Sequence, residues 1–218
     1  MTDDATRRWL GATWTFVRTA LPPAPARVVE IGCGPAGGFL PALAAAGYDA
    51  VGVDPEAPEG PQYRRMEFER WSPPAPADAV VACTSLHHVD DLDAVLERIA
   101  AATRPGAIVV VVEWARERFD ERTATWCFDR LPPGDGWLHR HAARWRESGA
   151  PWPAYLDEWA ATERLHRGDA IVAALGRRFR TRSVEAAPYF FADLGLSDDD
   201  ERSAGIALTG LRYVGLAE

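Results

Sequence analysis

Short apolar runs alternate with amphipathic segments along residues 26–114. The runs ARVVEIG, YDAVGVD, ADAVVACT and AIVVVVEW predict buried strands, and QYRRMEF predicts a weaker one. Between them, GGFLPALAAAG and DLDAVLERIAAATRPG predict helices, the first closed by Gly47 and the second starting at Asp91 as N-cap and ending at Pro105 and Gly106. Strands and helices that alternate at this spacing indicate βαβ units and a parallel sheet. Because Val, Ala and Ile run on without polar alternation, we expect helices on both faces of that sheet.

The segments that flank this core predict further helices and strands. Residues 4–20 place Trp9, Ala12, Phe16 and Thr19 on one side of an opening helix, which the prolines of 22–25 end. Residues 115–175 contain no strand-like run and predict helical pieces that are broken at 131–136 and 148–153. FRTRSVEAAPYFF and LRYVGLA then predict two strands around a helix capped by Ser197.

Together these elements predict an α/β fold, with a Rossmann-like, doubly wound, seven-stranded and mostly parallel sheet. The 218 residues, 47% of them hydrophobic, suit a single domain with a substantial core. We expect that domain, 1–218, to consist of an N-terminal lid helix (1–25), a cofactor-binding core (26–114), a helical substrate cap (115–175) and C-terminal strands that complete the sheet (176–218).

Composition restricts the partners and the location. No apolar run approaches the about 20 residues of a membrane helix, and the N-terminus has no signal-peptide core, so we expect a cytoplasmic protein without a membrane partner. A net charge of −8 argues against nucleic acid as the main partner, and we expect a monomer or homodimer. The small-molecule partner that we expect is an implication of the family resemblance described below. The three cysteines form no CxxC pair, so neither a zinc site nor a disulfide framework is indicated.

A glycine-rich turn, VVEIGCGPAGG, follows the first predicted strand. Gly32, Gly34 and Gly37 satisfy G-x-G-x-x-G, and such a turn before a helix offers backbone N–H groups to a ligand at the carboxyl edge of the sheet. Asp54 ends the next strand, where an acidic residue can bind the hydroxyls of a ribose. The turn therefore predicts a cofactor that contains a nucleoside.

Glu30, two positions before the first glycine, distinguishes between cofactors. Its carboxylate would repel a pyrophosphate but attract a ligand with an ammonium and a sulfonium group, and S-adenosylmethionine carries both. On this interpretation Gly37, the third glycine of the G-x-G-x-x-G pattern, has no particular role in binding the cofactor. The alternative is that Glu30 caps a neighbouring backbone amide.

The turn resembles the E/D-x-G-x-G-x-G motif of class I S-adenosylmethionine-dependent methyltransferases, with Ala36 in place of the usual third glycine. ADAVVACTSLHHVDDLDAVLERIAAATRPGAIVVVVEW resembles the segments around strands four and five in the small-molecule branch of that family. The resemblance covers residues 26–114 well and the last 40 loosely. It implies S-adenosyl-L-methionine as the cofactor and S-adenosyl-L-homocysteine as its product.

Carried over by position, the motif implies a binding residue for each part of the cofactor. The glycine turn would hold the methionine end and Asp54 the ribose, with Pro55 beside the adenine. Glu67 and Phe68 would bind the adenine, with Glu69 as a rival because the loop register is open. The implied set is Glu30, Gly32, Cys33, Gly34, Asp54, Pro55, Glu67, Phe68, Cys83 and Thr84, the last two under the methionine part.

Three residues at the carboxyl edge are candidates for a general base. His87 and His88 follow the fourth strand and Glu113 ends the fifth, so each can reach a ligand there. The alternative for the histidines is local packing, since similar turns occur in relatives with different acceptors. We expect the two adjacent histidine side chains to diverge, and no third ligand is evident, so no metal site is predicted.

Six of the nine tryptophans fall between residues 114 and 159. Aromatic walls around the cleft would suit an apolar or aromatic small molecule. The candidate substrate residues are Trp9, Trp114, Trp137, His139 and His141. The alternative is that most of these rings form the core of the cap itself.

The leading hypothesis is methyl transfer from S-adenosylmethionine to oxygen or nitrogen of a small metabolite. An NAD(P)-dependent Rossmann oxidoreductase or epimerase is the alternative, although Glu30 and the absence of lysine, which rules out a Y-x-x-x-K pair, count against it. A non-catalytic protein that binds S-adenosylmethionine, or a subunit that activates a partner, is a third.

Overall fold

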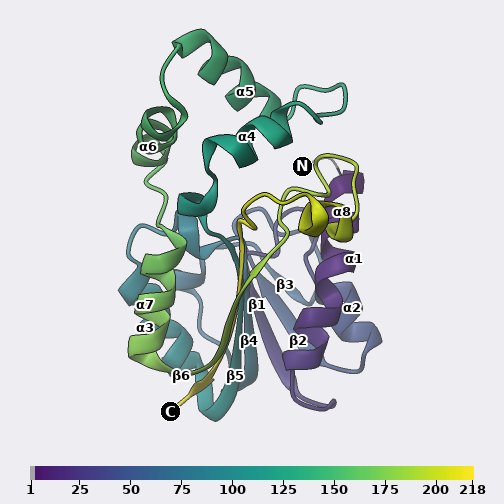
Figure 1. The fold of residues 1–218 in the computed structure, drawn as a ribbon. Helices are drawn as coiled ribbons and strands as arrows, with labels where there is room; N and C mark the ends of the chain where they lie inside the picture. Colours follow the sequence, from purple (N-terminus) through teal and green to yellow (C-terminus); the bar gives the residue numbers. More distant parts are fainter. Residues whose placement is uncertain (1–2) are drawn as a thin grey trace.

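A mixed sheet forms the centre of the computed structural model, which describes residues 3–218 (Figure 1). The sheet is seven-stranded with the order β3-β2-β1-β4-β5-β7-β6. Strand β7 runs in the direction opposite to that of the other six. The predicted fold class is confirmed. The first two residues of the predicted lid segment lie outside the described part. The strands are β1 (Arg27–Ile31), β2 (Asp49–Val53), β3 (Tyr63–Arg64), β4 (Ala77–Cys83), β5 (Thr103–Trp114), β6 (Phe179–Ala187) and β7 (Gly210–Ala217).

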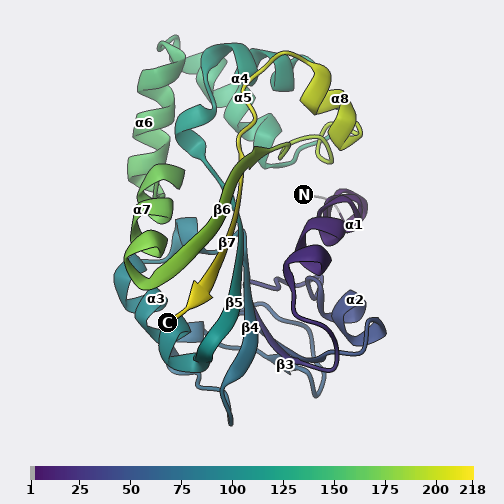
Figure 2. The same ribbon diagram turned by 60° about the horizontal axis from the view of Figure 1, so that its bottom comes forward.

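Helices cover both faces of the sheet, as the unbroken apolar strands predict (Figure 2). One face packs against α1 (Asp3–Ala20) and α2 (Leu40–Ala45), the other against α3 (Leu92–Ala102) and α7 (Gly168–Arg178). Alternate residues of each strand point to opposite faces of the sheet. Val28 therefore packs in the core beneath α1 and α2, and Val29 in the core beneath α3 and α7. This arrangement leaves the carboxyl ends of β1, β2, β4 and β5 at one edge, where a ligand can bind.

The opening helix packs on the sheet by a stripe that overlaps the predicted face at Trp9, with Ala12 and Phe16 partly buried beside it. Its buried residues are Ala5, Trp9, Thr13 and Val17, whereas Thr19 is exposed. Their spacing of four follows one stripe of the helix along the sheet. Phe16 lies beside that stripe, where the guanidinium of Arg212 sits 5.0 Å from its ring centroid.

Two predicted boundaries are wrong by a few residues. The helix α3 ends at Ala102, before Pro105 and Gly106, because Thr103 is already extended and pairs with Ala77 of β4. Its predicted N-cap is confirmed, since the Asp91 carboxylate accepts the N–H of Ala94 at 3.0 Å. The strand β6 ends at Ala187, and the predicted continuation into PYFF is a loop.

Three helices form a cap above the carboxyl edge, namely α4 (Glu121–Phe128), α5 (Trp137–Ser148) and α6 (Trp152–Thr162) (Figure 1). Both predicted breaks occur, but the second is shorter than predicted, 149–151 instead of 148–153. The cap has its own core, which includes Phe119, Trp152 and Phe190. The predicted cap range also included α7, but that helix buries Ile171 and Leu175 in the core beside α3, so it belongs to the sheet layers.

Short elements complete the chain. The helix α8 (Asp198–Ser203) starts at the predicted cap Ser197, whose hydroxyl accepts the N–H of Asp200. Three single turns of 3-10 helix are η1 (Phe68–Arg70), η2 (Leu86–His88) and η3 (Arg116–Arg118). No helix among residues 3–218 is both long enough and apolar enough to cross a lipid bilayer.

Candidate active site

The glycine turn after β1 packs tightly on one side and is open on the other. Gly32 (φ +81°) donates its N–H to Val53 O at 3.0 Å, and a Cβ there would lie 2.5 Å from that of Ser85. Gly34 (φ +60°) has no atom within 4 Å of a Cβ built on it, and its N–H donates to Oδ2 of Asp54 at 3.0 Å. The open side of the turn is therefore available for close approach by a ligand.

Glu30 is fully buried and joins β1 to the start of α2. The N–H of Phe39 lies 2.9 Å from each oxygen of its carboxylate, which is the amide-capping geometry considered as the alternative role. Burial raises the pKa of Glu30 to about 8, the charge of Asp54 adds to that rise, and the amide of Phe39 opposes it. The residue also lines the cavity beside the turn.

The second and third glycines of GPAGG are structural requirements that the sequence interpretation missed. A Cβ on Gly38 (φ +56°) would lie 2.1 Å from Oε1 of Glu30. Gly37, which that interpretation treats as incidental, has φ +81° and faces the Tyr63 hydroxyl, 2.5 Å from a built Cβ. Both positions therefore need glycine for backbone and space.

Two adjoining cavities surround the glycine turn, and every predicted cofactor residue lines at least one of them. The first, of about 510 Å³, is bounded by Glu30, Gly32, Cys33, Gly34, Cys83 and Thr84, and is covered by α1. The second, of about 430 Å³, is bounded by Gly32, Gly34, Asp54, Pro55, Glu67, Phe68 and Thr84. Glu69, the rival of Glu67, lines the second cavity as well.

These cavities fit S-adenosylmethionine in shape and charge. The open face of Gly34 allows the main chain to approach the ligand, and a positively charged ligand would favour ionisation of the Glu30 carboxyl, whose pKa burial raises to about 8. The buried phenyl ring of Phe68 supplies an apolar wall in the cavity that Asp54 reaches. The residues present therefore suit the cofactor that the sequence predicts.

Thr84 lies where the cofactor cavities meet a third one. It lines both cavities above and also a cavity of about 400 Å³ under the cap. Its φ of +46° is unusual for a residue with a side chain, and its N–H donates to Val112 O at 2.8 Å. Thr84 therefore combines an unusual backbone conformation with a position shared by all three cavities.

His87 is held from behind by Glu113, and both side chains are buried. Nδ1 of His87 lies 2.5 Å from Oε2 of Glu113, which favours the tautomer with the proton on Nδ1. Among residues 3–218 no hydrogen bond to Nε2 is formed, and His87 lines the third cavity. Glu113 therefore supports the histidine and does not itself line the cavity.

The two histidine rings lie side by side, with centroids 4.1 Å apart, so the expected divergence is wrong. Both rings belong to the single 3-10 turn of η2. Burial, together with the neighbouring His87, lowers the pKa of His88. No cluster of three or more His, Cys, Asp or Glu residues suited to a metal ion occurs within residues 3–218.

The third cavity, here called the acceptor cavity, brings most of the predicted substrate residues together. Trp9, Trp114, Trp137 and His141 line it. His139 does not, because its Nε2 lies 2.6 Å from Pro132 O in the loop before α5 and its ring faces a separate cavity. The sequence interpretation missed lining residues from two distant segments, Trp159, Glu163, Leu165, Tyr189 and Asp193.

The loop that carries Tyr189 and Asp193 is anchored by a buried acid. The Glu201 carboxylate accepts the N–H of Tyr189 at 2.9 Å and that of Phe191 at 2.6 Å. Glu201 lies in the run SDDDER, where nothing in the sequence distinguishes it from its exposed acidic neighbours. Only the packing of α8 against this loop reveals its role.

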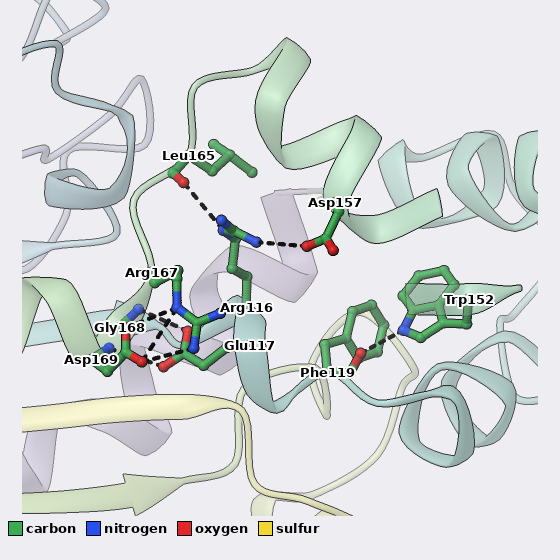
Figure 3. Close-up of polar contacts among 9 residues, drawn as sticks. All are labelled: Arg116, Glu117, Phe119, Trp152, Asp157, Leu165, Arg167, Gly168 and Asp169. Carbon is green, nitrogen blue, oxygen red and sulfur yellow. Dashed lines mark hydrogen bonds and ion pairs between the residues drawn. The ribbon is translucent and has the colours of Figure 1, made fainter. Parts of the chain in front are cut away.

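Two chain segments, 115–118 and 163–169, join the cap to the sheet, and hydrogen bonds connect them to each other (Figure 3). Glu117, after β5, accepts the N–H of Gly168 at 2.8 Å and of Asp169 at 2.9 Å, at the start of α7. Arg116 donates to Leu165 O at 3.1 Å and lies 3.7 Å from the exposed carboxylate of Asp157 on α6. These contacts set the position of the cap relative to the acceptor cavity.

The same connection also reaches the turn after β4. His166 donates its backbone N–H to His87 O at 3.0 Å, and its Nε2 lies 2.8 Å from Val89 O. The cap and the His87 turn are therefore coupled through one residue.

Comparison with known proteins agrees with this geometry. A family described as "Methyltransferase domain" matches residues 5–159. The chain belongs to this methyltransferase family. A ubiquinone biosynthesis O-methyltransferase of Rhodopseudomonas palustris is 36% identical over 98 residues, which are 39% of this chain and only 38% of that relative.

Solved methyltransferase structures share the fold across nearly the whole chain. An S-adenosylmethionine-dependent methyltransferase from Mesorhizobium loti has a TM-score of 0.60 at 18% identity, covering 94% of this chain and 97% of its own. The N-methyltransferase NodS from Bradyrhizobium japonicum, in complex with S-adenosyl-L-homocysteine, has a TM-score of 0.58 at 13% identity. The match covers 99% of this chain and 89% of the NodS chain. The predicted methyltransferase family, its fold and S-adenosylmethionine as its cofactor are thereby confirmed, and the oxidoreductase or epimerase alternative is a different family.

Proposed function

We propose that the protein transfers a methyl group from S-adenosylmethionine to an oxygen or nitrogen atom of a small apolar or aromatic molecule. The observation that carries this proposal is the position of Thr84, which lines both cofactor cavities and also the aromatic cavity that His87 lines. A methyl donor on one side of Thr84 and an acceptor on the other would be held for direct transfer.

In this proposal the chain mainly binds and orients. The bound cofactor supplies a methyl group that its sulfonium already activates. The glycine turn, Glu30, Cys83 and Thr84 hold the methionine end, Asp54 the ribose, and Pro55, Glu67 and Phe68 the adenine. Correct placement of two reactants can supply about 7–11 kcal/mol of a barrier.

We infer that His87 is the general base and Glu113 a positioning residue. The carboxylate holds Nδ1, so Nε2 is the nitrogen that can take the proton of the acceptor. His88 lines both the acceptor cavity and the cofactor cavity that Asp54 and Phe68 line. It is therefore proposed as a contact to substrate or cofactor and as a second candidate for the base.

The choice between oxygen and nitrogen rests on similarity alone. The curated relative is named as an O-methyltransferase and NodS as an N-methyltransferase. A net charge of −8 supports a small molecule over nucleic acid. A cytoplasmic location and a monomer or homodimer complete the proposal.

Two measurements test it. Calorimetry with S-adenosylmethionine, S-adenosylhomocysteine and NAD should show binding of the first two only. Mass spectrometry of a metabolite extract incubated with protein and cofactor should then show a product heavier by one methylene unit. Absence of cofactor binding would contradict the proposal, and tight binding without turnover across such extracts would favour a non-catalytic cofactor-binding protein.

A further inference from the structure

The walls of the acceptor cavity are mainly aromatic. Trp114 is the central ring, 5.3 Å from Trp159 and 6.3 Å from Trp137 between centroids, and it stacks on Tyr189 at 6.3 Å. Trp9 of α1 lines the same cavity and contacts Tyr189 edge to face. The π faces of such rings carry partial negative charge and attract cations.

The charged residues that line this cavity are both acidic. Glu163 is exposed at its rim, close enough to His88 to affect its pKa, and Asp193 lies deeper, half-buried. No arginine is among the described residues that line it. His141 is stacked on Trp159 at 3.7 Å, and burial lowers its pKa to about 4, so it is neutral at physiological pH.

Asp193 lacks hydrogen-bond donors. Among residues 3–218 none donates to its carboxylate, and burial raises its pKa to about 6, with Arg8 and His139 opposing that rise. Arg8 is directed elsewhere, to Ala192 O at 2.9 Å and toward Asp4 at 3.5 Å. A half-buried carboxylate that faces a cavity without hydrogen bonds is stabilised by a cationic partner.

We propose that the acceptor cavity selects small molecules that carry a protonated amine on an apolar or aromatic body. The rings surround the cation and the body, while Asp193 and Glu163 supply the opposite charge. Carboxylates and phosphates of similar size meet two negative side chains, and no arginine is among the described residues that line the cavity. The proposal deepens the function above and rests on it, because it assigns the substrate class of the same cavity.

A set of three probes of equal shape tests the charge selection directly. The binding of 2-phenylethylamine, 2-phenylethanol and phenylacetate to the full chain is measured by calorimetry and tryptophan fluorescence, with S-adenosylhomocysteine present throughout. We expect the amine to bind at least about tenfold more tightly than the alcohol, and the carboxylate more weakly than both.

Variants then assign the selection to its residues. Asp193→Asn and Glu163→Gln should each reduce the amine-to-alcohol ratio by several-fold, whereas Asp129→Asn and Glu147→Gln, exposed acids elsewhere on the cap, should leave it unchanged. Equal binding of amine and alcohol, tighter binding of phenylacetate, no binding of the amine at millimolar concentration, or a ratio insensitive to both cavity variants would overturn the proposal. Binding of S-adenosylhomocysteine alone is measured first in a separate titration, and its loss would identify failure of the proposed function instead.

Discussion

The Glu113 carboxylate holds His87 and the turn that carries it at the same time. Its Oε2 lies 2.5 Å from Nδ1 of His87, while its Oε1 accepts the N–H groups of Ser85 at 2.7 Å and Leu86 at 2.6 Å. One buried acid at the end of β5 thus orients both the imidazole and the backbone after β4. This arrangement makes His87 a better placed base than its neighbour.

His87→Asn is expected to lower kcat by about 10²-fold or more, the usual contribution of a general base, with little change in the affinity for S-adenosylhomocysteine. Glu113→Gln should lower kcat less, by roughly tenfold, because one oxygen can still accept from the turn. Steady-state kinetics and calorimetry measure the two effects separately. A larger loss of kcat in His88→Asn than in His87→Asn would show that the wrong histidine has been assigned.

Gly34→Ala and Gly38→Ala should fail in different ways. Gly38→Ala places a methyl group 2.1 Å from Oε1 of Glu30, so we expect it to lose about 3 kcal/mol of unfolding free energy from strain and a broken buried hydrogen bond. Gly34→Ala has open space and should lose only about 1 kcal/mol, yet weaken cofactor binding at least tenfold. Denaturant unfolding and calorimetry compare them. Normal cofactor affinity in folded Gly34→Ala would mean that the ligand does not approach this turn.

Cofactor binding should release a proton from Glu30. The pKa of this carboxyl is raised from 4.5 to about 8 in the folded protein, so the stability it contributes is present below pH 4.5 and is lost as the pH rises through about 8. A cationic ligand nearby lowers that pKa again, so affinity for S-adenosylmethionine should rise between pH 6 and 8. Calorimetry in buffers of different ionisation enthalpy detects the released proton, which Glu30→Gln should abolish. Unchanged proton release in that variant would contradict this assignment.

Glu117→Gln should loosen the cap without affecting the cofactor. The substitution weakens two hydrogen bonds that the Glu117 carboxylate accepts from N–H groups at the start of α7 (Figure 3). We expect the free energy of local unfolding there to fall by about 1–2 kcal/mol. Hydrogen exchange should accelerate at 115–118 and 165–169, and KM for the acceptor should rise. Asp157→Asn, which removes an exposed ion pair of 3.7 Å in the same region, is the matched control and should change little. Equal effects of the two variants would show that Glu117 is not the anchor.

Amine binding should weaken as the pH falls through about 6. Asp193 has its pKa raised to that value by burial, and its protonated form no longer attracts a cation. Arg8 and His139 also lie near this carboxyl, so Asp193→Asn is needed to assign the effect. The pH dependence of 2-phenylethylamine binding, measured by calorimetry, should flatten in that variant, and its persistence would point to another group.

The cofactor half of the site was predictable because it is local in the sequence. Glu30, Gly32 and Gly34 lie on one strand-turn-helix segment, and Asp54 directly follows the adjacent strand. Parallel strands present their carboxyl ends at one edge, so these residues must meet whatever the rest of the chain does. The predicted sheet, its strands and the caps Asp91 and Ser197 follow from the same local patterns.

The acceptor half depended on packing between distant segments. Trp9, Trp159 and Asp193 come from the first helix, the cap and a late loop, and each has a sequence environment that suits a core or a surface equally well. The sequence by itself determined the family, the parallel sheet and the cofactor turn, because those depend on contiguous residues. Only the tertiary structure decided which tryptophans face the cavity, that His139 faces away and that Glu113 holds His87, because these contacts arise from how whole layers pack together.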